Sequence, residues 1–489
     1  MTTKHKLLNI GTTLLIAVCV LASACSRDDG DRLQRFASSQ CRMVARVDME
    51  RLLRQYDCSR NADGTVKVAG PVEGALNLLP VDVRVPTREI LGNPYIRYDE
   101  AVMLVGACDG DINAVIFTVS DAGKFISQQS QASGLNADSE EGWEYLTLSD
   151  GCHLIASGHT ALIITGKELP AKLVKRLEKE AAEAPLGKIF ADGLRCKGRT
   201  ISVYLRIKSR DIPDMMIPAG TPRDGMALLA SDAMDGKNWN MRAELLAADG
   251  KPMPPLLSGH VETGLLRFAG TGHNVALLAG DGHEFMRRLA SLTADLRISA
   301  MAACIEGPAM VSARVDSTLV ASGGRDGLSV SAAFTCAKGK ARQVLDRYIR
   351  VLAPPGAAYS PGKSLSFTTK TTYYAPSENY WEDDTERVAV NRITFSVDGD
   401  LLLVTCNATP GKNRLGAHGG SLGNSSLAVL ADIPAGTELP AGGTLPFGLT
   451  SSFTVTGNSA VINAAVTGTD RTFAACMASI GQIIAGTIE

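Results

Sequence analysis

The sequence predicts an α+β fold in which repeated strand-turn-helix units form mainly antiparallel sheets that are covered by helices. Glycine is abundant (48 of 489 residues) and aromatic residues are few (5%), which is more typical of sheets and turns than of helical bundles. Alternating apolar runs followed by a Gly or Asp turn and a helix-periodic segment recur along the chain. The run 200–208 alternates cleanly, which favours antiparallel sheets with one solvated face over the alternative, parallel strands with β-α-β crossovers.

Length and charge narrow the class of protein further. A chain of 489 residues predicts two or three domains, because domains commonly contain about 100–200 residues. The 49 basic and 51 acidic residues give a net charge of −2, without the basic excess of a nucleic-acid-binding protein. We therefore expect no nucleic-acid partner.

The N-terminus has the layout of a secretory signal peptide. Lys4 and Lys6 form a short positive region, 14–21 is an apolar run, and the small residues 22–24 precede Cys25. This arrangement resembles a bacterial lipoprotein, which implies cleavage before Cys25 and lipid on its thiol and amino groups. The alternative is ordinary cleavage nearby, which would release a soluble protein. We expect 1–24 to be removed and Cys25 to anchor the chain in a membrane.

The residues after Cys25 bear on where the protein is placed. Ser26 stands where an Asp would favour the inner membrane, so the resemblance implies the outer membrane. The acidic run 26–31 is similar to the export tag of surface lipoproteins, or it is only part of a solvated tether. We assign 25–40 to a tether and leave open whether the protein faces the periplasm or the cell surface.

The first strand-turn-helix unit illustrates the recurring pattern. The alternating run 43–47 predicts a strand, and 49–56 has apolar residues at helical spacing. Asp48 lies between them and is predicted to cap the helix by accepting hydrogen bonds from its first amides. The other predicted strand and helix pairs are 113–119 with 121–126, 160–165 with 170–184, 274–279 with 284–292, 328–336 with 340–352, and 460–466 with 470–484.

A repeated tetrapeptide suggests that a domain is duplicated. Ala-Arg-Val-Asp occurs at 45–48 and again at 313–316. Together with the recurring strand and helix pairs, this predicts a first α+β domain over 41–300 and a second over 301–489. Such units must share sheets to bury their apolar faces.

An aromatic-rich loop is predicted at 353–390, beginning at Pro and Gly residues. Its aromatic residues are far more frequent than in the rest of the chain, and an acidic run follows them. Exposed aromatic side chains bind sugars or anchor peptides, so this loop is the candidate binding surface. The alternative is that these side chains pack the loop onto a sheet. The candidate contact residues are Tyr373, Tyr374, Tyr380 and Trp381.

No motif predicts a catalytic residue, a metal site or a cofactor. Ser421 satisfies G-x-S-x-G, but it lies in a glycine-rich loop and no histidine follows it, as a nucleophile elbow would require. The histidines are scattered and there is no C-x-x-C pair. A disulfide between Cys41 and Cys58 is one option, and the other is that both thiols stay free.

The layout resembles lipoproteins of about 500 residues from Bacteroidota that carry a domain of unknown function. The resemblance rests on Cys25, the opening unit 44–53 and repeated units such as 274–292. It implies no activity. We expect a non-enzymatic binding or structural lipoprotein of the cell envelope with a protein or glycan partner. The alternative is a hydrolase whose site is assembled from distant residues.

Overall fold

The computed structural model divides into two compact units. Unit 1 comprises Met1–Ile212, Thr221–Met253 and Asp470–Glu489, and unit 2 comprises Pro213–Gly220 and Pro254–Thr469. The boundary predicted between residues 300 and 301 therefore falls inside unit 2. The structure describes residues 30–56, 58–61, 65–67, 90, 92–108, 112–195, 198–207, 226–255, 257–293, 296–316, 318–319, 327–375, 385–422, 424–438 and 444–485.

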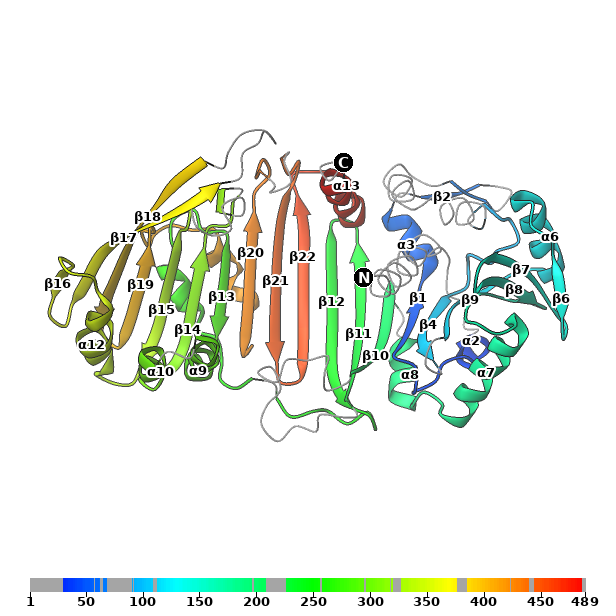
Figure 1. The fold of residues 1–489 in the computed structure, drawn as a ribbon, viewed down its shortest axis with the longest axis horizontal. Coiled ribbons are helices and arrows are strands. Elements are labelled where there is room, and N and C mark those ends of the chain that lie inside the picture. The colour runs from blue at the N-terminus through cyan, green and yellow to red at the C-terminus, as the bar shows by residue number, and fades with distance from the viewer. Residues whose placement is uncertain are drawn as a thin grey trace. The chain divides into compact units, whose positions relative to one another are not determined.

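Unit 1 is built on a ladder of ten strands among its described residues (Figure 1). Every neighbouring pair in it is antiparallel. In spatial order the strands are β6 (Asp138–Glu140), β7 (Trp143–Ser149), β8 (Cys152–Ser157), β9 (Thr160–Thr165), β5 (Ile112–Thr118), β4 (Val102–Cys108), β1 (Met43–Val47), β10 (Ile201–Ile207), β11 (Met226–Asp235) and β12 (Asn238–Ala247). A separate small hairpin pairs β2 (Ser59–Arg60) with β3 (Val66–Lys67).

Helices bury both faces of the centre of this ladder. On one face Ala45 and Val47 of β1 pack in a cluster with residues of α3 and α6. On the other face Val44 of β1 packs in a cluster with residues of α2, α7 and α8. These helices are α2 (Gly30–Gln34), α3 (Met49–Gln55), α6 (Ala122–Ser133), α7 (Pro170–Glu183) and α8 (Lys188–Leu194). The last helix, α13 (Phe473–Ala485), returns to unit 1, where Phe473 stacks on Trp239.

Unit 2 contains a second antiparallel ladder of ten strands in the part of the chain that the structure describes. The neighbouring pairs are all antiparallel. In spatial order the strands are β16 (Ala358–Ser360), β17 (Ser364–Ala375), β18 (Thr385–Asp398), β19 (Leu401–Cys406), β15 (Val330–Cys336), β14 (Ile305–Ala313), β13 (Val275–Ala279), β20 (Leu427–Ile433), β21 (Gly448–Thr456) and β22 (Ser459–Thr467).

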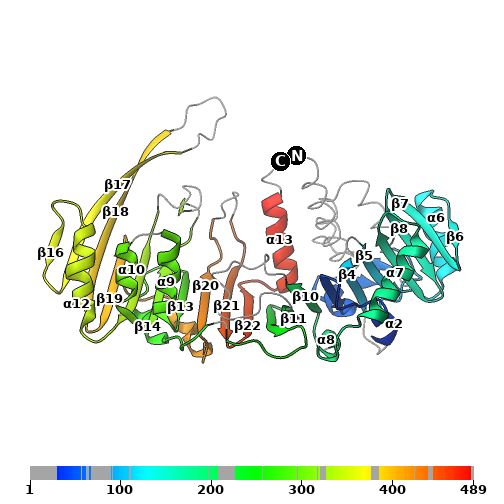
Figure 2. The same ribbon diagram turned by 60° about the horizontal axis from the view of Figure 1, so that its bottom comes forward.

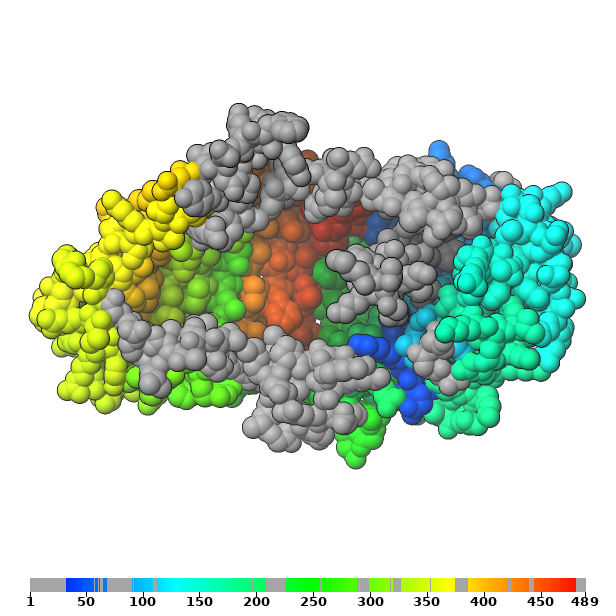
Figure 3. Space-filling view, in the orientation of Figure 1, coloured from blue at the N-terminus to red at the C-terminus, as the bar shows by residue number. Residues whose placement is uncertain are grey.

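The helices of unit 2 also lie on both faces of its ladder. Figure 2 shows α9, α10 and α12 beside the strands of unit 2, and Phe334 of β15 belongs to the core cluster that they share. On the opposite face η3 and η6 pack over Leu278 and Met310. The bounds are η3 (Thr263–Phe268), α9 (Gly282–Thr293), α10 (Leu296–Ala302), α12 (Lys340–Gln343), η4 (Val344–Ile349), η5 (Arg350–Leu352) and η6 (Leu415–Ser421). Strands β20 and β21, in orange, are visible on one face in the space-filling view, and most residues of β21 are half-exposed (Figure 3).

The fold class predicted from the sequence is therefore wrong. Strands dominate, and they follow one another in hairpins such as β11–β12 and β21–β22, with no helix between the partners. What recurs is the pairing order of a whole ten-stranded ladder, which is the same in the two units, and not a strand-turn-helix unit. The tetrapeptide repeat does not mark corresponding strands. Residue 45 lies in β1, whose counterpart in that order is β13, whereas residue 313 ends β14.

Candidate functional site

The chain enters unit 1 as a packed segment. The sequence predicts a tether over 25–40, but in its described part, residues 30–40, α2 and the residues after it are bound to the unit. Phe36 is fully buried, the amide of Ser39 donates to the carbonyl of Ala184, and Ser38 forms a bridge with Pro185. The apolar Leu33, Phe36 and Ala37 explain the difference, because they bury area that a solvated tether would expose. The predicted signal peptide and lipid site Cys25 lie outside the described residues.

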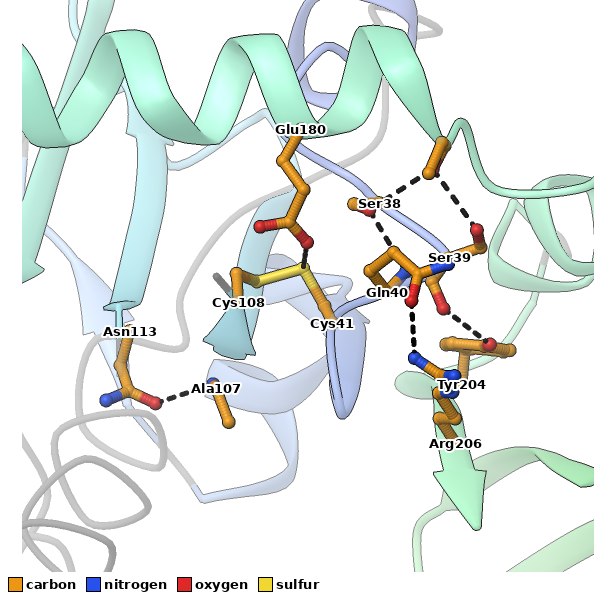
Figure 4. Close-up of a disulfide and its surroundings, with 11 residues drawn as sticks. Ser38, Ser39, Gln40, Cys41, Ala107, Cys108, Asn113, Glu180, Tyr204 and Arg206 are labelled. Atoms are coloured by element: carbon orange, nitrogen blue, oxygen red, sulfur yellow. Dashed lines mark hydrogen bonds between the residues drawn. A yellow bond between two sulfur atoms is a disulfide. The ribbon is translucent and has the colours of Figure 1, made fainter. Parts of the chain in front are cut away.

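A disulfide links this entering segment to the sheet. Cys41, just before β1, is bonded to Cys108 at the end of β4, and both residues are fully buried (Figure 4). A bulge positions Cys108: Ala107 has a left-handed backbone (φ 50°), and its amide donates to Asn113 Oδ1 (2.9 Å). The pairing of Cys41 with Cys58 is therefore wrong, because the sulfur of Cys41 is bonded to that of Cys108.

Glu180 of α7 lies against this disulfide. Its Oε1 is 3.9 Å from Cys41 Sγ, so two sulfurs and a carboxylate meet at one point. Both sulfurs are consumed in the S–S bond, and a metal would need thiolates. The cluster is therefore a covalent clamp at the entry of the chain and not a metal site.

The predicted aromatic loop is mostly a long hairpin, so its assignment as a loop is wrong where the structure describes it. β17 and β18 pair over twelve residue pairs, from Ser364 opposite Ser396 to Ala375 opposite Thr385. Their Thr, Val, Tyr and Phe residues have high β propensity, which outweighs the Pro and Gly residues before them. β16 pairs only with 364–366 of β17, and β19 pairs only with 393–398 of β18.

The outer part of this hairpin, residues 367–375 and 385–392, is therefore a two-stranded ribbon that no other described strand joins. We call it the arm, and Figure 2 shows it extending beyond its neighbours. An isolated two-stranded hairpin is marginally stable in water. A ribbon of this kind gains stability from anything that covers its faces or edges.

The two faces of the arm differ in exposure. Ala389 and Tyr373 share the covered face, and Tyr373 is only 5% exposed. Val388 and Val390 lie on the other face and are 53% and 52% exposed. They stand opposite Thr372 and Lys370 of β17. Pairs of exposed valines on one projecting strand form a candidate contact surface.

The four aromatic residues predicted as contacts are thus not placed together on this surface by the described structure. Tyr373 is buried, which matches the alternative in which these side chains pack against the sheet. Tyr374 lies in β17 opposite Glu386. Tyr380 and Trp381 lie outside the described residues. The valines at 388 and 390 were missed, although their alternation in the run 386–391 is the signal of a strand with one solvated face.

Asn407 sets the point at which the arm leaves the sheet. It follows β19 with a left-handed backbone (φ 49°), a conformation that Asn tolerates better than most residues. Its amide donates to the carbonyl of Arg392, and its Oδ1 accepts from the amide of Arg392 (2.8 Å). Its Nδ2 donates to the carbonyl of Leu328 (2.9 Å). The side chain therefore replaces the next strand residue and ends the ladder at Arg392.

A buried histidine network lies next to this point. His273 is 3% exposed, and its Nδ1 accepts from the amide of Gly270, so the proton of the neutral ring is on Nε2. Nε2 donates to Ser329 Oγ (3.0 Å), which in turn donates to the carbonyl of Asn407. Burial lowers the pKa of His273 to about 4. The ring is therefore neutral at physiological pH and acts as a structural link to the base of the arm.

The remaining candidates for chemistry have structural partners. Ser421 ends the 3-10 helix η6 and does not follow a strand, so the nucleophile elbow is not formed. His418 Nε2 lies 3.4 Å from Asp432, whose carboxylate also pairs with Arg414. His159, His260 and His283 contact backbone carbonyls, and His153 contacts the hydroxyl of Thr147.

Comparisons with known proteins leave the family of this chain open. No family model and no curated protein matches it. Three crystal forms of TP0453 (I, IV and III) are similar at 12% sequence identity with a TM-score of 0.30. They cover 45%, 44% and 47% of this chain and 80%, 79% and 88% of theirs. Similarity at this level does not establish a shared fold. Among the described residues no helix is long and apolar enough to span a membrane.

Proposed function

We propose that the protein is a lipoprotein of the cell envelope, anchored in the outer membrane by lipid on Cys25, with a non-enzymatic binding or structural role. The sequence supports the anchor through Lys4 and Lys6, the apolar run 14–21 and the small residues before Cys25. Several acyl chains, at about 0.8 kcal/mol for each buried methylene, hold such a protein on a membrane without a spanning helix.

The observation that best supports export from the cytosol is the disulfide between Cys41 and Cys108. Disulfides form and persist in oxidising compartments such as the periplasm and the cell surface, and they are rare in the cytosol. A bond that clamps the first packed segment of the chain supports secretion independently of the N-terminal pattern.

The arm supports the binding role. Exposed apolar side chains on a projecting strand lose unfavourable contact with water when a partner covers them. Val388 and Val390 are the exposed residues, and the aromatic ring of Tyr373 is turned into the protein. Because the apolar side chains exposed on the described part of the arm are aliphatic, a protein partner is the first choice and a glycan the second.

The anchor is tested by replacing Cys25 with Ser and fractionating cells. We expect wild type in the membrane fraction with an acylated N-terminal peptide, and Cys25→Ser in the soluble fraction or uncleaved. Cys19→Ser, which changes a cysteine inside the predicted signal peptide, is the matched control and should behave as wild type. A wild-type N-terminal peptide without acyl mass would overturn the anchor.

The binding role is tested with a photo-crosslinking amino acid at Val390 in intact envelopes. Val351, which is 71% exposed but lies away from the arm in η5, is the matched control position. We expect a defined crosslinked species from position 390 and none from 351. Equal or absent crosslinking at the two positions would refute the arm as a binding surface.

A further inference from the structure

Two free cysteines lie next to each other in the core of unit 2. Cys304 comes between α10 and β14, and Cys336 ends β15. In the pairing of β14 with β15, Cys336 is opposite Ile305, and the amide of Ala337 donates to the carbonyl of Cys304 (3.0 Å). Each cysteine is therefore the chain neighbour of the residue that the other one faces.

The backbone at this point suits a disulfide. Antiparallel strands lie about 5 Å apart and rise about 3.4 Å per residue, so diagonal neighbours such as Cys304 and Cys336 have Cα atoms about 6 Å apart. Disulfides join Cα atoms that are about 4.4–6.8 Å apart. Diagonal residues of two regular strands point to opposite faces, but Cys304 is not in a regular strand. Its amide donates to the carbonyl of Met301 (3.0 Å), as in a helical turn.

Both side chains pack on the same face of the ladder. Cys336 is 4% exposed and belongs to the core cluster that α9, α10 and α12 share, and the half-buried Cys304 packs against this cluster. Sγ of Cys304 donates a weak bond to the carbonyl of Ala300 (3.6 Å), which a covalent bond would replace. Burial, followed by the negative charge of the Cys304 thiolate, raises the pKa of Cys336 to about 11. The two sulfurs are therefore near enough to influence each other.

We propose that Cys304 and Cys336 form a dithiol site that is oxidised to a second disulfide, which joins the end of α10 to the end of β15. The oxidant is another disulfide, R–S–S–R, either a small one such as oxidised glutathione or that of an oxidoreductase. An oxidising compartment supplies such reagents. The bond would hold a helix of unit 2 on its ladder, as Cys41–Cys108 holds the entering segment of unit 1.

The reaction consists of two exchange steps. The thiolate of Cys304, the more accessible sulfur, attacks R–S–S–R, breaks its S–S bond and releases one R–S⁻. The thiolate of Cys336 then attacks the sulfur of Cys304, breaks the mixed disulfide and releases the second R–S⁻. The two thiol protons end on the released groups, and two electrons pass from the cysteines to the reagent. The second step is slow at neutral pH, because Cys336 stays mostly protonated.

Cys406 provides a matched control within unit 2. It is the remaining cysteine among the described residues of that unit, and it is half-buried like Cys304. It lies opposite Val330 in the pairing of β15 with β19, six residues from Cys336 along β15. That separation is about 20 Å, which is too far for a disulfide.

The decisive experiment treats the purified chain with oxidised glutathione and maps its bonds. Samples are alkylated, digested with trypsin and analysed by mass spectrometry without reduction. Trypsin places Cys304 in peptide 298–314 and Cys336 in peptide 326–338, and we expect these peptides to become joined. A mixed disulfide at Cys304 should appear first and convert to the internal bond about tenfold faster at pH 8 than at pH 7, as the thiolate fraction of Cys336 rises.

Three variants test the assignment of each sulfur. Cys304→Ser should abolish the internal bond, and Cys406→Ser should leave its yield unchanged. In Cys336→Ala the mixed disulfide at Cys304 should form and persist, which shows that the site is folded and that Cys336 is the resolving thiol. A wild-type mixed disulfide that never converts, or a bond from Cys304 to Cys406, would overturn the inference.

This test does not depend on the proposed function. Oxidation of the purified chain requires neither the lipid on Cys25 nor the arm. A joined pair of peptides supports the dithiol site even where fractionation shows no anchor. Failure of the pair to join at pH 9, while alkylation reaches Cys304, overturns the site and leaves the anchor and the arm as they stand.

Discussion

Removal of the Cys41–Cys108 disulfide is the sharpest test of the described structure. The bond joins the segment before β1 to the end of β4, and it closes a loop of 67 residues. In the chain-entropy model a loop of that length lowers the entropy of the unfolded chain by about 15 cal/mol/K, which corresponds to about 4 kcal/mol at 25 °C. We expect Cys41→Ala/Cys108→Ala to lower the free energy of unfolding of unit 1 by about 2–4 kcal/mol.

Urea unfolding followed by tryptophan fluorescence can measure this loss in unit 1. Trp143 and Trp239 both lie in unit 1, and a Trp381→Phe background removes the signal from unit 2. This choice of probes matters because two units need not unfold in one step. The double variant should shift the midpoint to lower urea, and reduction of the wild type should give a similar shift.

Two results would refute this reasoning. A change below about 1 kcal/mol would mean that the loop is constrained in the unfolded state by something other than this bond. A peptide map that joins Cys41 to Cys58 would show that the pairing itself is wrong. Cys58→Ala is the control, and since Cys58 is half-buried and lies outside the Cys41–Cys108 bond we expect a loss of at most about 1 kcal/mol.

Three further predictions address single positions. Asp281→Ala removes the carboxylate that accepts from the amide of Glu284 in the first turn of α9 and should cost about 1 kcal/mol of stability in denaturant unfolding, whereas Asp249→Ala at an exposed turn should cost little. The pKa of His273 is about 4 in the folded protein against 6.5 in the unfolded chain, so the free energy of unfolding should fall by up to about 3 kcal/mol as pH drops from 6.5 through 4. His273→Asn should flatten this dependence on pH, and an unchanged slope in the variant would contradict the assignment. Asn407→Ala should destabilise unit 2 by about 1–3 kcal/mol, more than Asn407→Gly, which keeps the left-handed backbone; equal losses would show that only the side-chain bonds matter.

Local elements could be predicted from the sequence because their signals are local. The strand at 43–47 and the helix that follows are confirmed as β1 and α3, and Asp48 caps that helix by accepting from the amide of Arg51 (3.2 Å). The helix expected at 170–184 is confirmed as α7, with Pro170 at its start. Each depends on residues a few positions apart, where capping and helical periodicity act.

Strand partners could not be predicted, because antiparallel strands with similar apolar alternation are interchangeable at the level of pattern. β1 pairs with β4 and with β10, and β10 begins more than 150 residues after β1. Nothing local in 43–47 distinguishes these partners from the other strands. The disulfide could not be predicted for the same reason. Cys58 is closer to Cys41 in the sequence, but the pairing of β1 with β4 brings Cys108 beside Cys41.

The exposed residues of the candidate site could not be predicted either, because they too depend on strand pairing. The local excess of aromatic residues pointed to the segment that contains the arm, yet Tyr373 is turned inward and the exposed apolar residues are valines. How far β18 has a neighbouring strand depends on where β19 stops, and the ladder ends at Asn407, fifteen residues beyond Arg392 in the sequence. A single side chain that imitates a strand residue thus ends the ladder, and among the described residues no strand continues it along β18. The proposed binding surface therefore begins where the described ladder ends, a feature that composition does not record and the pairing of strands does.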